Sequence, residues 1–221
     1  MKPNRIITGF LGSEFSGLDA AKQEIISNNK ESSIYHLNQI HSDTIHIVTA
    51  GSEPGEISTG DALSTDCYNK ILLLKTADCM PIIYYSKTQA RITAAHCGWR
   101  GIRSRLHLKA LNTFIVPADV CIEIGPHLYG QSFQVKEDLI RYFEKDGHKI
   151  EKYLKRDENS TKNKYLFDMT RYVEEEFIKS GVPRDQIKIS PDCTLDSSKY
   201  YSHRAGANRT QRNYSFIGML P

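Results

Sequence analysis

The sequence predicts an α+β fold (mixed α/β), and three observations carry that prediction. β-prone apolar runs alternate along the chain with segments whose apolar residues have helical spacing. Some neighbouring runs are separated by a short polar turn that is typical of a hairpin, whereas others are separated by a helical segment. Strands joined in both ways give mixed sheets. The length of 221 residues fits one larger domain, which we expect to span 1–221.

Helices are predicted where apolar residues recur at three- and four-residue spacing. Pro117 ends the second predicted helix, because proline cannot continue the hydrogen-bond ladder. Gly181 and Pro183 end the last one. In chain order the predicted helices cover 18–26, 102–115, 135–143 and 167–179.

Strands are predicted from short runs rich in β-branched, leucine and aromatic residues. In chain order these runs are 71–74, 82–85, 92–96, 120–124, 187–189 and 214–219. The stretch from Lys145 to Lys164 is rich in Lys, Glu, Asp and Asn and has little apolar pattern. We interpret it as a mobile excursion within the domain.

Composition sets several classes of function aside. Hydrophobic residues make up 39% of the chain and charged residues 25%, and no apolar stretch approaches the roughly 18 residues of a membrane span. A net charge of +3 is too small to indicate a nucleic acid as the partner. The first residues lack the apolar stretch of a signal peptide, so we expect a cytoplasmic protein. Five cysteines, an odd number, then indicate free thiols rather than disulfides.

Two of the apolar runs flank a short polar turn and predict a hairpin that carries Cys79 and His96. If the turn is centred on 87–88, these two residues lie directly opposite each other across an antiparallel pair. Opposite residues have Cβ atoms about 4.5 to 5.5 Å apart, which is close enough for one metal ion or for a Cys–His hydrogen-bonded pair. A loop one residue longer would place Cys79 opposite Cys97 instead, and Pro81 indicates an edge or a bulge.

An open zinc site needs a third ligand, and His41 is the best-placed candidate. Three protein ligands, here His41, Cys79 and His96, would leave the fourth position for water or substrate, as in catalytic zinc sites. The neighbouring His36 and His46 are interpreted as satisfied surface groups.

Two further features of this region could carry chemistry. Gly98 and Gly101 flank Trp-Arg where a strand gives way to a helix, so backbone amides and Arg100 could approach an anion there, although such loops are also ordinary turns. Asp78 precedes Cys79 and could move protons at the site. Its alternative role is that of a structural hydrogen-bond acceptor, because strand alternation turns it away from the Cys79 face.

Short motifs follow one another in a fixed order over most of the chain. The motifs are Asn38–His41, Gly60–Thr65, Thr76–Pro81, Ala94–Gly101, Gly125–His127, Asp192–Thr194, Tyr201–Arg204 and Thr210–Arg212. In residue types and spacing they resemble the multicopper polyphenol oxidase (laccase-like) domain family, also described as purine nucleoside phosphorylase and adenosine deaminase enzymes of the YfiH and LACC type. The chain departs from the family pattern at Ser42, Cys97 and Gln131–Val135, which affects substrate preference and the rim of the pocket rather than the predicted ligands.

The resemblance implies a layered α/β/β/α sandwich in which His41, Cys79 and His96 hold a zinc ion. It also implies purine nucleosides and phosphate as substrates. The implied reactions are phosphorolysis of adenosine, inosine, guanosine or methylthioadenosine to the base and ribose 1-phosphate, and hydrolytic deamination of adenosine to inosine. We expect a monomer or a small homo-oligomer.

Arg204 and Arg212 lie in two of the family-like motifs and are the predicted phosphate-binding residues. Guanidinium groups suit this role because their planar fork matches phosphate oxygens. The alternative is that both arginines only pair with surface carboxylates. We expect Arg209 to face solvent.

Three other functions remain open from the sequence. A thiol hydrolase could use Cys79 as nucleophile and His96 as its base. A copper oxidase would agree with the older family name, but the eight histidines form no His-X-His pair of the kind that a multicopper site uses. Finally, the basic and aromatic segment Lys199–Tyr214 could form a nucleic-acid surface.

Overall fold

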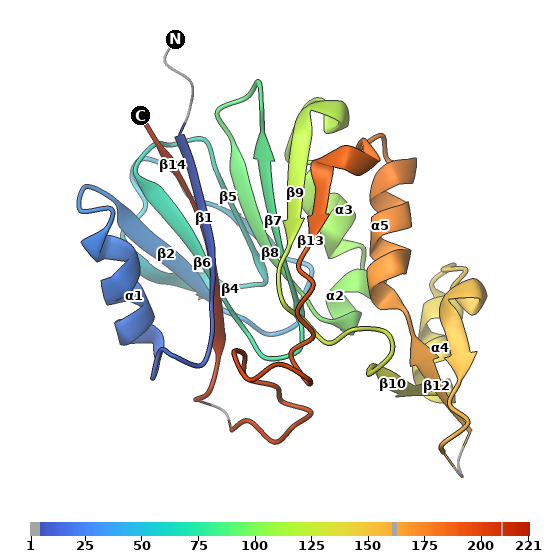
Figure 1. Cartoon of the computed structure of the whole chain (residues 1–221). Helices are drawn as coiled ribbons and strands as arrows, with labels where there is room; N and C mark the ends of the chain where they lie inside the picture. Colours follow the sequence, from blue (N-terminus) through green and yellow to red (C-terminus); the bar gives the residue numbers. More distant parts are fainter. Residues whose placement is uncertain (1–4, 161–162, 209) are drawn as a thin grey trace.

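The fold consists of two stacked sheets with helices on their outer faces, in a computed structural model that describes residues 5–160, 163–208 and 210–221 (Figure 1). One sheet has five strands and the other six, and a separate small sheet has three. Both large sheets contain parallel and antiparallel pairs. The predicted mixed α/β class and the layered α/β/β/α arrangement are confirmed.

The five-stranded sheet lies against α1 (Leu18–Ser27). Ala21 and Ile25 of this helix share a core with Ile71 and Leu73 of the sheet. In spatial order its strands are β1 (Arg5–Leu11), β14 (Asn213–Leu220), β6 (Lys70–Thr76), β2 (Ser33–Asn38) and β4 (Gly55–Thr59).

The six-stranded sheet carries helices on its other face. These helices are α2 (Trp99–Arg103), α3 (Leu106–Leu111) and α5 (Met169–Lys179), and their apolar residues form the largest core of the chain with that sheet. In spatial order the strands are β13 (Ile187–Ile189), β9 (Val120–Ile124), β7 (Met80–Ser86), β8 (Ile92–Cys97), β5 (Ala62–Thr65) and β3 (Ile45–Ile47).

Both faces of the central strands are buried, and this explains their uninterrupted apolar sequences. Leu72 of β6 and Ile83 of β7 lie in the core between the two sheets. The next residue of β6, Leu73, faces α1, and Ile82 of β7 faces the helices on the opposite side. Because successive side chains of a strand point to opposite faces, a strand covered on both sides needs apolar residues at every position.

The single helix predicted over 102–115 is wrong, because the structure divides it into α2 and α3. Arg105 lies between them with φ 58°, in the left-handed region. A helix cannot continue through a residue in that conformation. Apolar periodicity survives the break, since Ile102 and Leu106 both pack into the same core.

The segment expected to be an excursion without regular structure contributes to the three-stranded sheet. Val135 pairs with Tyr165, so the helix predicted from 135 begins later. Asp168 caps α5 by accepting a hydrogen bond from the Arg171 amide, which is why that helix begins at Met169 rather than at Phe167. The elements of this region are β10 (Gln134–Lys136), α4 (Glu137–Lys145), β11 (Leu154–Arg156) and β12 (Lys164–Phe167).

Apolar periodicity also predicts none of the strands β1 to β5. Several of them are short or polar, such as β3 and β4, and form only through their pairing with neighbours. The five cysteines are all free, as expected. Among the helices in the described parts of the chain, none is long and apolar enough to cross a bilayer.

Candidate metal centre

Cys79 and His96 approach each other at one end of the β7–β8 hairpin, but not in the predicted register. Met80 pairs with Cys97, and Pro81 pairs with His96. Cys79 therefore lies one residue before β7 begins and is directly opposite neither His96 nor Cys97. Both registers considered from the sequence are wrong.

The difference comes from the turn of the hairpin, which is longer than the sequence suggested. The Ser86 hydroxyl accepts hydrogen bonds from the amides of Thr88 and Gln89 and so stabilises a wider loop. This loop moves the register by two residues relative to the prediction. Because side-chain direction in a strand repeats every two residues, the shift leaves Cys79 diagonal to His96, still within reach.

His41 joins these two residues and completes a group of three potential metal ligands. One ligand atom from each of His41, Cys79 and His96 lies within 4.8 Å of the others. Cys79 Sγ is 3.7 Å from His41 Nε2, and the two imidazole rings meet edge to face with centroids 4.8 Å apart. Within the part of the chain that the structure describes, this is the one such group of His, Cys, Asp and Glu side chains.

Gly98 makes room for the group of three ligands. A Cβ atom added at this position would lie 2.9 Å from Cys79 Sγ and 2.9 Å from His41 Cδ2. Any other residue would therefore push into the space between the ligands. The glycine that the sequence marks at the end of this strand is required by the site and not only by the turn.

Asp61 is a buried neighbour of the group to which the sequence analysis gave no role. Its carboxylate is fully buried and accepts a 2.8 Å hydrogen bond from His96 Nδ1. A signal was present in the sequence, because Asp61 belongs to the motif Gly60–Thr65. Nothing in that motif, however, indicates which histidine the carboxylate meets.

Cys79, His96 and Asp61 form an ionised network in the metal-free chain. Burial alone would raise the pKa of the Cys79 thiol, but the charge of His96 and the hydrogen bond with His41 lower it to about 6. Burial likewise opposes a charge on His96, but the Cys79 thiolate and the bond to Asp61 raise its pKa to about 9. Cys79 is therefore held as a thiolate, which is the form that binds metal.

The three ligands line a cavity of about 660 Å³ that also contains every other predicted site residue. Asp78, Arg100, Arg204 and Arg212 all contribute to its wall. The cavity is built from segments far apart in the sequence, since it includes residues from 38 to 212. Other lining residues, which the sequence analysis did not assign to the site, are Asn38, Gln39, Lys75, Thr76, Ala77, Trp99, Leu128, Phe133 and His203.

The three predicted arginines line the cavity, and their guanidinium groups have no carboxylate partner among the described residues. The guanidinium of Arg100 lies 4.4 Å from the centroid of the Trp99 ring. Arg204 donates to the carbonyl of Gln134, and Arg212 donates to two main-chain carbonyls of its own loop. None of the three arginines forms an ion pair within those residues. Arg209, expected to face solvent, lies outside the described residues.

Asp78 has both carboxylate oxygens engaged. Oδ1 accepts the hydroxyl proton of Thr194 at 2.7 Å, and Oδ2 accepts the main-chain N–H of Arg204 at 2.7 Å. Asp78 has φ 78°, in the left-handed region, immediately before Cys79. These contacts are those of a structural acceptor, and its role as a proton carrier stays a prediction.

His36 and His46 do not join the group of ligands. His46 Nε2 lies 2.9 Å from the Thr59 carbonyl. The interpretation of His36 as a satisfied surface group is wrong, because His36 is buried and its Nδ1, 3.7 Å from Glu56, has no hydrogen-bond partner among the described residues. Among the described residues of the segment Lys199–Tyr214, Tyr214 is buried, and Arg204 and Arg212 line the cavity.

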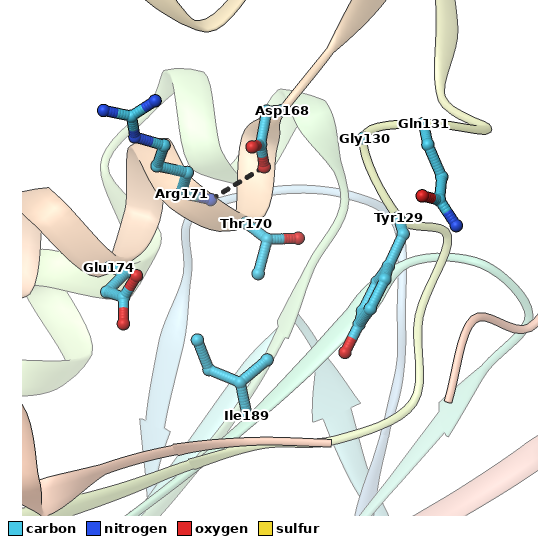
Figure 2. Close-up of a pocket in the computed structure, with 8 residues that line it drawn as sticks. All are labelled: Tyr129, Gly130, Gln131, Asp168, Thr170, Arg171, Glu174 and Ile189. Carbon is cyan, nitrogen blue, oxygen red and sulfur yellow. Dashed lines mark hydrogen bonds between the residues drawn. The ribbon is translucent and has the colours of Figure 1, made fainter. Parts of the chain in front are cut away.

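A second hollow of about 420 Å³ lies beside the first turn of α5 and contains none of the predicted site residues (Figure 2). Thr170, on its wall, donates its hydroxyl proton to His127 Nε2 at 2.7 Å, while His127 Nδ1 donates to the Gly125 carbonyl. Burial lowers the pKa of His127 to about 4. The motif Gly125–His127 thus supports this part of the fold and adds no ligand to the metal group.

Comparison with known proteins finds a matching family and relatives of similar sequence. The family described as multi-copper polyphenol oxidoreductase laccase matches residues 19–220, a range that includes all three potential ligands. A purine nucleoside phosphorylase of Rickettsia prowazekii (strain Madrid E) is 31% identical over 194 residues, which cover 83% of this chain and 76% of that protein. Purine nucleoside phosphorylase YlmD of Bacillus subtilis (strain 168) is 27% identical over 72% of this chain, and the match spans 58% of the length of YlmD.

Solved structures share the fold. YlmD from Geobacillus stearothermophilus has a TM-score of 0.81 at 21% identity, over 98% of this chain and 92% of that chain. The Bacillus licheniformis hypothetical protein YfiH has a TM-score of 0.80 at 26% identity, over 90% of this chain and 79% of that chain. The two-sheet architecture that brings the ligands together is therefore common to these proteins.

Proposed function

The chain belongs to the family described as multi-copper polyphenol oxidoreductase laccase, and from that premise we propose that it is a zinc-dependent purine nucleoside phosphorylase. The observation that carries the proposal is one cavity that is lined by three potential metal ligands and by three arginines. Relatives named purine nucleoside phosphorylase support the same reaction. The proposed nucleosides are adenosine, inosine, guanosine and methylthioadenosine.

The donor set fits a zinc ion. Two imidazoles and one thiolate are common zinc ligands, and Gly98 leaves the space between them open. A metal bound there would supply a Lewis acid that polarises a substrate group or makes a water molecule more acidic. His41, Cys79 and His96 are the residues that would hold it. Copper is a less favoured alternative, because the group is a single site of three ligands.

Phosphate is the proposed co-substrate for cleavage of the glycosidic bond. Arg204 and Arg212 lie on the wall of the cavity and have no carboxylate partner among the described residues, so their charges are available to an anion. Arg100 adds a third positive charge beside the aromatic ring of Trp99. Trp99 and Phe133 give the cavity flat apolar surfaces that suit a purine ring.

Hydrolytic deamination of adenosine is proposed as a second activity of the same cavity. This reaction needs a water molecule at purine C6 and a group that moves protons. Asp78 is the proposed proton carrier, and its two occupied oxygens mean that it would have to exchange one of its present hydrogen bonds to act.

One observation favours a second candidate function. The pKa of Cys79 is lowered to about 6, which is also the property of a catalytic thiol. A thiol hydrolase would use Cys79 as nucleophile and His96 as base. The two functions exclude each other, because a thiolate bound to metal is not free to attack a substrate.

One experiment distinguishes the zinc-dependent phosphorylase from the thiol hydrolase. The purified chain is analysed for metal and incubated with adenosine, with and without phosphate, and the products are identified. We expect about one zinc per chain, adenine and ribose 1-phosphate only with phosphate, and inosine in both cases. A metal-free chain that is inactivated by thiol alkylation would overturn the proposal in favour of the thiol hydrolase.

A further inference from the structure

We propose that Asp61 is a positioning residue that orients two of the three potential metal ligands, His41 and His96, at the same time. The inference rests on the metal site of the proposed function. Asp61 is buried and is not among the residues that line the cavity, so its effect would pass through the two histidines.

The single carboxylate of Asp61, the residue immediately before β5, accepts five hydrogen bonds from two different parts of the chain. Four of these hydrogen bonds come from the loop after β2. The main-chain N–H groups of Ile40, His41 and Ser42 donate at 3.3, 3.0 and 2.5 Å, and the Ser42 hydroxyl donates at 2.7 Å. The fifth comes from β8, where His96 Nδ1 donates at 2.8 Å. All of these bonds are shielded from water, because the Asp61 side chain has no exposed surface.

The three loop amides converge on one point because of the conformation of His41. This residue has φ 62°, in the left-handed region that few residues other than glycine adopt. A residue in that region turns consecutive N–H groups to the same side, which creates a concave site for an anion. Here the anion is the chain's own Asp61.

The carboxylate offsets the unfavourable backbone of His41. A left-handed conformation is unfavourable for a residue with a side chain. Hydrogen bonds to a charged group are among the stronger ones in proteins, so the bonds from His41 and its two neighbours offset that cost. Without the carboxylate, we expect the loop to leave the left-handed conformation and the His41 side chain to move away from Cys79.

The fifth bond fixes the protonation pattern of His96. Since the carboxylate can only accept, His96 Nδ1 must carry a proton. The lone pair that remains for a metal is then on Nε2. The His96 amide also donates to the Asp61 carbonyl at 2.7 Å, so the main chain and the side chain of His96 are both held by Asp61.

The test compares Asp61→Asn with Ser64→Ala, a control three residues later in β5. Asparagine keeps the size of the side chain, but it removes the charge and places an N–H₂ group among donors. Ser64 is equally buried and takes part in hydrogen bonds with Ile92 and Thr93, away from the ligands. For both variants of the full chain, zinc affinity is measured by competition with a chromophoric chelator, and unfolding is measured on the metal-free protein.

We expect Asp61→Asn to lose about 10- to 100-fold in zinc affinity, the usual effect of removing a carboxylate behind a histidine ligand. With Co²⁺ in place of zinc, the same variant should show altered visible absorption bands, which report the geometry of the ligands. Ser64→Ala should lower the unfolding temperature but keep the affinity and the bands. Wild-type affinity in Asp61→Asn would overturn the inference and leave the proposed metal site intact.

A second measurement needs no variant and is unaffected if Asp61→Asn does not fold. Long-range ¹H–¹⁵N correlation spectra of the wild-type chain loaded with zinc should show His96 protonated at Nδ1. Zinc bound at Nδ1 of His96 would overturn the inference. A wild-type chain that binds no zinc would overturn the metal site of the proposed function, and the role of Asp61 with it.

Discussion

The main-chain amide of Arg204 donates a 2.7 Å hydrogen bond to the carboxylate of Asp78, a residue 126 positions earlier in the chain. The other oxygen of that carboxylate accepts the Thr194 hydroxyl. Asp78 also immediately precedes Cys79. One side chain therefore links a potential metal ligand to the loop that carries a predicted phosphate-binding arginine.

The first prediction concerns this link. Asp78→Asn should raise the KM for phosphate roughly tenfold, because loss of a charged hydrogen bond of about 1.5 kcal/mol leaves the Arg204 loop less well placed. The deamination rate should fall more steeply, because Asp78 is also the proposed proton carrier of that reaction. Steady-state kinetics of both reactions check this, with Asp66→Asn, a more exposed carboxylate that pairs with Arg91, as the control. Deamination that changes less than the KM for phosphate, with an unchanged pH profile, would contradict the role of proton carrier and leave Asp78 as a structural acceptor.

The second prediction concerns the thiolate. Cys79→Ala should abolish zinc binding and both activities together, because two histidines alone make a weak site. Metal content of the purified variant and its activity are the measurements. Cys67→Ala is the matched control, since Cys67 is a free thiol outside the cavity, and it should bind zinc normally. Full activity of a zinc-free Cys79→Ala chain would contradict the prediction.

The fold could be predicted from the sequence where burial is complete. The central strands around Leu72 and Ile83 are covered on both faces and stand out as apolar runs. The short strand around His46 could not be predicted, because its pairing with β5 and not its own residues makes it a strand. The break between the two helices at Arg105 could not be predicted either, because the apolar spacing continues through it.

The site was predictable in its residues but not in its geometry. His41, Cys79 and His96 stand together in the structure, although the hairpin register used to pair two of them was wrong by two residues. Cys79 and His96 still lie on the same face of the hairpin, because a register shift of two residues preserves the face of a strand. The partners of Asp61 could not be predicted. Its contacts with residues 40–42 depend on a left-handed backbone at His41, and no sequence pattern predicts that conformation.

The third prediction concerns the response of stability to pH. His107 is fully buried, and neither of its ring nitrogens has a hydrogen-bond partner in the described part of the chain. Burial and the charge of Arg105 lower its pKa to about 3. In the unfolded chain a histidine titrates near 6.5. Between these two pKa values the unfolded chain binds a proton at this histidine and the folded chain does not. The free energy of unfolding therefore decreases as the pH falls below 6.5.

Replacement of His107 should reduce that loss. At pH 5 the unfavourable contribution of His107 amounts to about 2 kcal/mol, from roughly 1.4 kcal/mol per pH unit. In urea unfolding of the metal-free protein at pH 7.5 and pH 5, His107→Leu should therefore lose about 2 kcal/mol less than the wild type. Equal losses in the two proteins would show that His107 does not titrate in this way.

The last prediction concerns phosphate binding. Arg204→Ala and Arg212→Ala should each raise the KM for phosphate steeply, because the cavity loses a positive charge that has no carboxylate partner among the described residues. Deamination needs no phosphate and should change much less. Arg141→Ala is the matched control, since Arg141 is exposed on α4 and pairs with Glu137, and it should leave both reactions unchanged. Equal loss of both reactions would indicate general damage to the cavity, and no loss of either would mean that the two arginines bind no phosphate.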